Sequence, residues 1–187
     1  MKKILLAIDP GAKGGIAALF PNGSIDVQTI PETVHDLASH IERFQILSLV
    51  ENCSIRAYVE QVNGFIGKAQ PGSAMFHFGQ NYGQILGVLS AYKIPFVLVT
   101  PQKWQKGFAL GKAERVKVSA DATPEARKLA ESKNAAAKRD WKKSLRARSQ
   151  QLFPDKSVTL TNCDALLILE YARQIEGSQK VTSGELL

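Results

Sequence analysis

Near its start the chain reads ILLAIDPG (residues 4–11), an apolar run that ends in Asp9 and a Pro-Gly turn. This pattern is typical of a buried β-strand that delivers a carboxylate at its end. A second apolar run ends in the same way at Glu60, and a third acid, Asp164, begins the helical pattern DALLIL (164–169). Acids at two strand ends and at a helix start can meet at one edge of a sheet, where a hard cation such as Mg²⁺ would offset their repulsion.

Outward from these runs, the spacing of apolar residues predicts an α/β fold with a mixed sheet. Strand patterns cover five segments: 3–9, 14–20, 24–30, 55–60 and 94–99. Turn-rich residues separate the first three, which predicts an antiparallel meander. Helical patterns cover 33–50, 73–92, a short segment that Thr100 and Pro101 begin, 124–152, and 164 to about 174. A break of the long helix near Asn134 stays open, and residues 107–123 are the best candidate for a mobile loop or an insertion.

The length of 187 residues and the hydrophobic content of 44% fit one domain with one sizeable core. We expect a single domain over residues 1–176, with a basic insertion and helical segment at about 107–150, and a poorly ordered polar tail over 177–187. No apolar stretch reaches the roughly 18 residues that a membrane span needs, and the start MKK runs into a strand pattern instead of a signal peptide. We therefore expect a soluble protein without a membrane partner that acts in the cytoplasm, either its own or that of a phage-infected host, with an organelle as the alternative.

Positive charge is concentrated in one segment. The net charge is +7, and residues 101–150 hold 14 Lys and Arg against 5 Asp and Glu, so that the remainder of the chain is slightly acidic. Such a patch attracts phosphates and releases counterions when it binds nucleic acid, whereas the alternative is a solvated helix face. The basic residues that we expect to contact nucleic acid are Lys103, Lys106, Lys138, Arg139, Lys142, Lys143 and Arg146.

Several short motifs follow one another along most of the chain. They are IDPG (8–11) with the glycine pair 14–15, VEQ (59–61), FHFGQNYG (76–83), VTPQKW (99–104), LFP (152–154) and DALL (164–167). In this order they resemble the RuvC-type Holliday junction resolvases, especially the RuvC-like proteins of phages and some organelles. The resemblance implies a ribonuclease H-like fold with a mixed five-stranded sheet flanked by helices, a homodimer with two active sites, and Mg²⁺- or Mn²⁺-dependent cleavage of four-way DNA junctions.

On this resemblance the catalytic residues are Asp9, Glu60 and Asp164, which would hold two metal ions, with Asp9 between them. RuvC has a further metal-binding residue one helical turn before the last acid, and this chain has Thr161 there. The Thr161 hydroxyl, the Asn162 carbonyl or water could complete the coordination. For each acid taken alone, a helix cap or a solvated strand end is the alternative.

The loop after the second acid contains Phe65, which the resemblance implies as an apolar wedge at the centre of the junction. Folding back onto the core is the alternative for this side chain. The predicted helix over 73–92 carries Gly79, Gly83 and Gly87 at a spacing of four, which makes a smooth stripe. Another backbone can approach such a stripe closely, and the resemblance favours a second copy of the chain over the sheet underneath.

The sequence therefore predicts a crossover junction endodeoxyribonuclease that nicks opposite strands of Holliday junctions in DNA recombination and repair. Three alternatives stay open. The chain could be a non-catalytic junction-binding module, because Thr161 stands where another metal ligand is expected. It could be a nuclease that acts on RNA or RNA–DNA hybrids with the same acids, or an actin-like phosphotransferase, which the DPG motif (9–11) alone suggests.

Overall fold

The computed structural model describes residues 2–11, 13–62, 72–108, 110, 116–119 and 121–184. Within these ranges the sheet has five strands: β1 (Lys3–Asp9), β2 (Gly15–Leu19), β3 (Ile25–Thr29), β4 (Ser54–Glu60) and β5 (Phe96–Val99). Their order is β3-β2-β1-β4-β5, with β1, β2 and β3 antiparallel and β4 and β5 parallel to β1. A meander joined to two parallel strands in this order is the ribonuclease H-like sheet, so the predicted fold class is confirmed.

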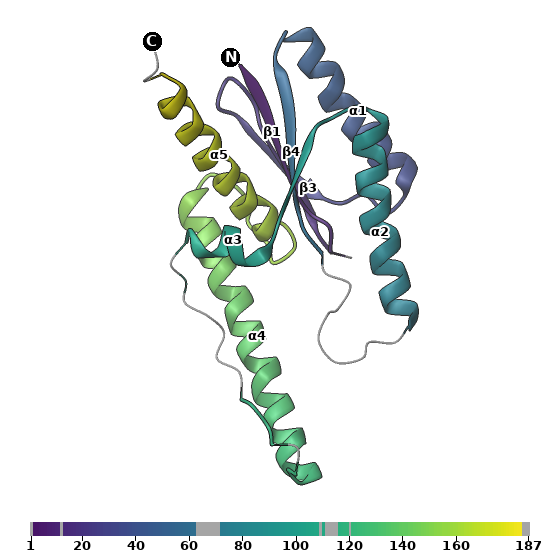
Figure 1. Ribbon diagram of the computed structural model, residues 1–187, viewed down its shortest axis with the longest axis vertical. Coiled ribbons are helices and arrows are strands. Elements are labelled where there is room, and N and C mark those ends of the chain that lie inside the picture. The colour runs from purple at the N-terminus through teal and green to yellow at the C-terminus, as the bar shows by residue number, and fades with distance from the viewer. Residues whose placement is uncertain are drawn as a thin grey trace.

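Helices cover both faces of the sheet (Figure 1). In the described ranges they are α1 (Val34–Val50), α2 (Gly72–Ala91), α3 (Pro101–Lys106), α4 (Pro124–Leu152) and α5 (Cys163–Gly184). The first two lie on one face, and α3, α4 and α5 lie on the other, where the free end of α4 extends far beyond the sheet (Figure 1). Each element agrees with a predicted segment, but α4 has no break and α5 is longer than expected.

The helix α4 runs without interruption through Asn134 because the side chain of this residue is engaged elsewhere. Its Oδ1 accepts a hydrogen bond from the backbone N–H of Val116 (2.8 Å), and its Nδ2 donates to the carbonyl oxygen of Val116 (3.1 Å). The amide therefore does not compete with the backbone of its own helix, which is how Asn usually interrupts a helix. Thr123 caps the start by accepting a hydrogen bond from the N–H of Ala126 (3.3 Å).

The predicted end of the last helix near Gln174 is wrong, since α5 continues to Gly184. Its polar second half is fixed by Glu176, which is only 9% exposed. The Glu176 carboxylate accepts hydrogen bonds from Lys3 Nζ (2.5 Å), Arg56 Nη1 (3.0 Å) and the Tyr58 hydroxyl (2.9 Å). Burial alone would raise the pKa of Glu176, but the hydrogen bonds from Lys3 and Tyr58 outweigh it and lower the pKa.

Two hydrophobic clusters lie on opposite faces of the sheet. Because side chains alternate along a strand, Leu5 and Ala7 of β1 pack against α3, α4 and α5, while Ile4, Leu6 and Ile8 pack against α1 and α2. All five side chains are 0–5% exposed. The central strand is thus held from both sides, which fixes the position of the acid at its end.

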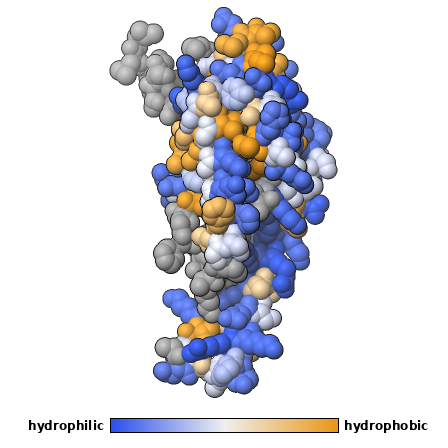
Figure 2. Space-filling model, turned by 90° about the vertical axis from the view of Figure 1, so that its right-hand side faces the viewer, coloured by the Kyte–Doolittle hydropathy of each residue, from blue (hydrophilic) through white to orange (hydrophobic). Residues whose placement is uncertain are grey.

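The surface differs between the two ends of the molecule. On the face that α1 and α2 form, hydrophobic side chains gather in the upper half, whereas the lower end, which α4 forms, is mostly hydrophilic (Figure 2). The exposed hydrophobic residues include Leu49 and Val50 at the end of α1 and Phe76 on α2. Among the described residues, no helix has an apolar stretch that could cross a bilayer.

Candidate functional site

Three acids meet at one edge of the sheet. The strands β1 and β4 are parallel, with Ile8 beside Val59, so Asp9 and Glu60 follow side by side at the same edge. Asp164 lies in the first turn of α5, which packs across β1 and β2. One carboxylate oxygen from each acid lies within 4.8 Å of the other two. The structure therefore brings together the three acids that the sequence singled out.

Two glycines allow this convergence. A Cβ atom on Gly14 would lie 1.9 Å from the carbonyl oxygen of Asp9, which no side chain can tolerate. A Cβ atom on Gly15 would lie 3.1 Å from the Cα of Asn162, so Gly15 lets the start of α5 approach β2 closely. The N–H of Gly11 donates a hydrogen bond to Asp9 Oδ1 (3.1 Å) and orients that carboxylate.

The acids repel one another in this partly buried position. Burial, followed by the charge of Asp164, raises the pKa of Asp9 to about 6. Burial and the charges of Asp9 and Asp164 raise the pKa of Glu60 to about 8. With such a pKa, Glu60 keeps its proton at neutral pH unless a metal ion joins the acids.

One cation is already present, and the sequence did not indicate it. Lys142 of α4 points into the carboxylate cluster, where its Nζ lies 2.5 Å from Asp164 Oδ2. Burial lowers the pKa of Lys142, but the charge and hydrogen bond of Asp164 outweigh this effect and raise it, so the side chain is positively charged. The structure places the Lys142 ammonium group against a carboxylate that is only 13% exposed, and the expected contact of Lys142 with nucleic acid stays a prediction.

The donor set fits a divalent metal ion. Carboxylate oxygens are the ligands that Mg²⁺ prefers, and Mn²⁺ accepts the same ligands. Asp9, Glu60 and Asp164 stand on two central strands and a buried helix start, so little entropy remains to be lost when they close around an ion. Two ions about 4 Å apart are the usual arrangement for phosphodiester hydrolysis, and the number of ions here stays a prediction.

The turn before α5 contains Thr161, the residue that we expected to complete the metal site. Its backbone N–H donates to Thr159 Oγ1 (3.2 Å), and the side chain is partly exposed. The neighbouring Asn162 is engaged in the turn: its Oδ1 accepts from the N–H of Thr159 (2.8 Å), and its carbonyl oxygen accepts from the N–H of Leu166 (3.1 Å). Each Asn162 oxygen keeps a second lone pair, so completion of the metal site by the Thr161 hydroxyl, the Asn162 carbonyl or water stays a prediction.

The other predicted basic residues lie on the surface. Lys103 and Lys106 are exposed on α3, which begins directly after β5, at the edge of the sheet where Glu60 pairs with Val99. On α4 the exposed residues are Lys138, Arg139, Lys143 and Arg146. Lys143 pairs with the exposed Asp140 (3.2 Å), and Arg146 Nε donates to the carbonyl oxygen of Val158 (3.0 Å). Phe65 lies outside the described residues, so its role as a wedge stays a prediction.

The glycine stripe on α2 does not pack on the sheet. Gly79, Gly83 and Gly87 are exposed, and an added Cβ atom at each would meet nothing within 4 Å. Instead, Ile85 and Leu89 turn toward the sheet and are buried. The alternative in which the stripe contacts the sheet is therefore wrong, and the stripe is accessible to another molecule.

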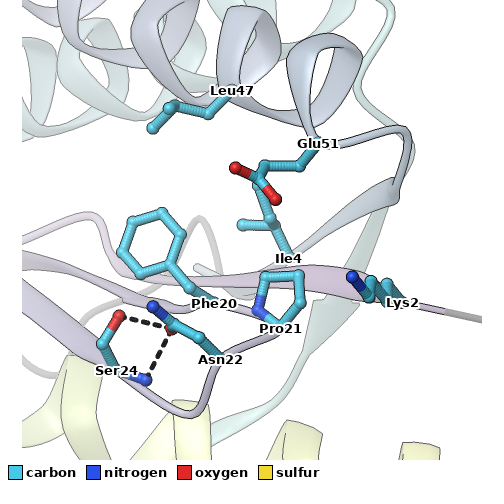
Figure 3. A pocket seen from close by; sticks show the side chains of 8 residues that line it. All are labelled: Lys2, Ile4, Phe20, Pro21, Asn22, Ser24, Leu47 and Glu51. Atoms are coloured by element: carbon cyan, nitrogen blue, oxygen red, sulfur yellow. Dashed lines mark hydrogen bonds between the residues drawn. The ribbon is translucent and has the colours of Figure 1, made fainter.

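A cavity at the far end of β1 is not part of this site. It has a volume of about 360 Å³, and its lining includes Ile4, Phe20, Leu47 and Glu51 (Figure 3). Since Ile4 precedes Asp9 by five residues on the same strand, about 17 Å separates this cavity from the acids. Glu51 is its single acidic side chain, so the acid cluster is the better candidate for chemistry on phosphates.

No family model matches the chain, and no curated protein matches it by sequence. Among solved structures, it is similar to T. thermophilus RuvC in complex with a Holliday junction substrate, at 15% identity and a TM-score of 0.48, over 92% of this chain and 96% of that chain. A second Thermus thermophilus RuvC structure matches at 15% identity and a TM-score of 0.45, over 91% and 96% of the two chains. Likeness at this level concerns the course of the backbone, and the roles of the residues rest on the geometry of this chain.

Proposed function

We propose that this protein is a metal-dependent endonuclease that resolves four-way DNA junctions by paired nicks and leaves 5′-phosphate and 3′-hydroxyl ends. The observation that carries the proposal is the meeting of Asp9, Glu60 and Asp164, each with a carboxylate oxygen within 4.8 Å of the other two. Acids at that spacing repel one another, so they do not stabilise the fold by themselves, but they form a good ligand set for divalent metal ions.

The chain's own residues would hold Mg²⁺ or Mn²⁺ at the edge of the sheet. Asp9 is held in place because β1 is packed on both faces and the N–H of Gly11 donates to its carboxylate. Asp164 enters the cluster from the first turn of α5. When bound, divalent metal activates water for attack on phosphorus and neutralises charge on the phosphate oxygens.

The basic residues of α3 and α4 would hold the nucleic acid near the acids. Lys103 and Lys106 lie on α3, beside the strand ends, and Lys138 and Arg139 lie on the exposed part of α4. Contacts from such side chains to phosphates position a duplex without reading its sequence. Binding should therefore weaken steeply as the salt concentration rises.

A second copy of the chain would supply the second nick. The exposed stripe of Gly79, Gly83 and Gly87 on α2, with Phe76 exposed by 68% on the same helix, offers a surface on which another α2 can pack. A two-fold axis through this contact would give two equivalent active sites, as paired nicks require. Gly83→Glu should convert the dimer to a monomer in light scattering, and an unchanged mass would remove this surface from the interface.

The test is cleavage of an end-labelled four-way junction in Mg²⁺ or Mn²⁺ at several salt concentrations. The wild type should nick opposite strands, and Asp9→Asn should still retard the junction without cutting it. Full nicking by Asp9→Asn would remove Asp9 from the mechanism. Competition with linear duplex and with an RNA–DNA hybrid separates a junction enzyme from a nuclease that prefers hybrids.

A non-catalytic junction-binding protein is the second candidate, and one observation favours it. Lys142 already neutralises Asp164 through a 2.5 Å contact, which is a way to stabilise the acids in a protein that binds no metal. This candidate predicts retarded junctions and no nicks at any concentration of Mg²⁺ or Mn²⁺.

A further inference from the structure

Lys142 brings a positive charge into the acid cluster that a metal ion would neutralise. It reaches the acids from α4, 22 residues before its partner, and its Nζ lies 2.5 Å from Asp164 Oδ2. Burial and neighbouring acids raise the pKa values of Asp9 and Glu60, and the positive charge of Lys142 opposes that rise at both. The ammonium group therefore acts on all three carboxylates and not on one ion-pair partner alone.

We propose that Lys142 is the resident counter-cation of the carboxylate cluster, and that its ammonium group and a divalent metal ion exclude one another at Asp164. The inference rests on the proposed function, in that it assigns a regulation to the same site. Lys142 is a positioning residue in this scheme: it holds the acids together in the metal-free protein and leaves when the metal binds.

The close approach of two positive charges favours the exchange. Both oxygens of Asp164 are engaged, Oδ2 by Lys142 and Oδ1 by the Cys163 thiol at 3.3 Å. A metal ion would lie about 2.1 Å from a carboxylate oxygen, so an ammonium group still 2.5 Å from the same carboxylate would be within a few ångströms of a double positive charge. Repulsion at such a distance is strong in a site that water reaches poorly.

The Lys142 side chain is able to move away from the acid cluster. Its ammonium group stands on a flexible four-carbon chain, and the Lys142 side chain is 33% exposed, so that rotation about its own bonds carries the charge to solvent. The helix α4 need not move. Asp164, at 13% exposed, stays behind as a ligand.

The chain contains a matched control one residue along α4. Lys143 pairs with Asp140 at 3.2 Å, and both side chains are 72% exposed. An ion pair in that setting is screened by water and contributes little to stability. Lys143→Met thus removes a lysine from the same helix without touching the acids.

The first experiment measures Mn²⁺ affinity by calorimetry without DNA, and thermal unfolding in a chelator, for Lys142→Met, Lys142→Arg, Lys143→Met and the wild type. Lys142→Met should bind Mn²⁺ about tenfold more tightly than the wild type, a usual size for coupling between two ligands. In chelator it should unfold about 2–4 °C lower. Lys142→Arg retains the charge and should stay close to the wild type in both measurements, as should Lys143→Met.

The second experiment uses the wild type alone, so it does not depend on the folding of a variant. Lysine acetylation by an amine-reactive ester is followed by mass spectrometry in chelator and in Mn²⁺. Exchange predicts that Lys142 reacts several-fold faster in Mn²⁺ than in chelator, while Lys143 reacts equally in both.

Equal or weaker Mn²⁺ binding by Lys142→Met would overturn the proposal, as would labelling of Lys142 that metal leaves unchanged or slows. Because neither experiment contains DNA, the outcomes separate from those of the nuclease assay. Exchange without junction cleavage would refute the proposed nuclease and keep the switch, whereas cleavage without exchange would refute the switch alone.

Discussion

Metal affinity should rise with pH, and the pKa values of the clustered acids determine how steeply it rises. Metal ions bind ionised carboxylates, so protons must leave before the site can close. With the pKa of Asp9 at about 6 and that of Glu60 at about 8, binding at about pH 7 should release about one proton, nearly all of it from Glu60. The release should be about two protons at about pH 5 and about 0.1 at about pH 9, so the affinity should rise about tenfold per pH unit near neutrality and level off at high pH.

Calorimetry of Mn²⁺ binding in two non-coordinating buffers with different ionisation enthalpies counts these protons directly. Glu60→Gln is the matched variant, because it keeps the size of the side chain and removes its proton. In this variant the release at about pH 7 should fall to about 0.1 proton, the part contributed by Asp9. A release near zero in the wild type at that pH would show that the acids are already ionised and would refute the reasoning.

The same pKa values give the metal-free protein an unusual dependence of stability on pH. Both acids have pKa values above those of the unfolded chain, so the folded state binds protons more tightly. The resulting stabilisation is complete below about pH 4 and is lost as the pH rises through about 6 and about 8. In chelator the free energy of unfolding should therefore fall between about pH 5 and about pH 8, and saturating Mn²⁺ should restore it.

Three further outcomes test the fold and the nucleic-acid surface. Gly14→Ala should lower the free energy of unfolding in urea by about 3 kcal/mol or more, because its Cβ would lie 1.9 Å from a backbone oxygen. The control Gly177→Ala, in open space on α5, should raise this free energy by up to about 1 kcal/mol. Glu176→Gln should lower the same free energy by about 1–3 kcal/mol at neutral pH, since it weakens three hydrogen bonds to β1 and β4; stability equal to the wild type would contradict this anchor. Lys103→Gln and Lys106→Gln should each reduce the slope of junction affinity against salt by about 1, and an unchanged slope would take that side chain off the DNA surface.

The fold was predictable because its decisive features are local. Each strand of the sheet coincides with a strand pattern in the sequence, and the acids Asp9 and Glu60 stand at the ends of two of these patterns. Parallel pairing of β1 and β4 then places them side by side. Asp164 followed from the apolar helix that it begins, since a helix so apolar must cross the sheet.

The sequence does not show which polar side chains contact one another when they lie far apart along the chain. The helical pattern of α4 places Lys142 on a basic arc but says nothing of the acid that faces it. Glu176 reads as the start of a polar tail, because the cations that bury it lie more than a hundred residues earlier. Asn134 reads as a helix breaker until Val116 engages its side chain. In each case a polar group is satisfied by tertiary structure, which periodicity does not record.

Because α4 is unbroken, it fixes the distances and directions between the side chains that it carries. Its 29 residues extend about 44 Å at the rise of an α-helix, and one rigid axis joins Lys142 at the acids to Lys138 and Arg139 outside them. On the proposed function, a duplex that rests on the outer half is held at a fixed height and angle above the scissile bond. A single residue inserted after Asp140 would rotate Lys138 and Arg139 by about 100° about the helix axis relative to Lys142, and these two cations would then no longer face the duplex that the acids are to cut.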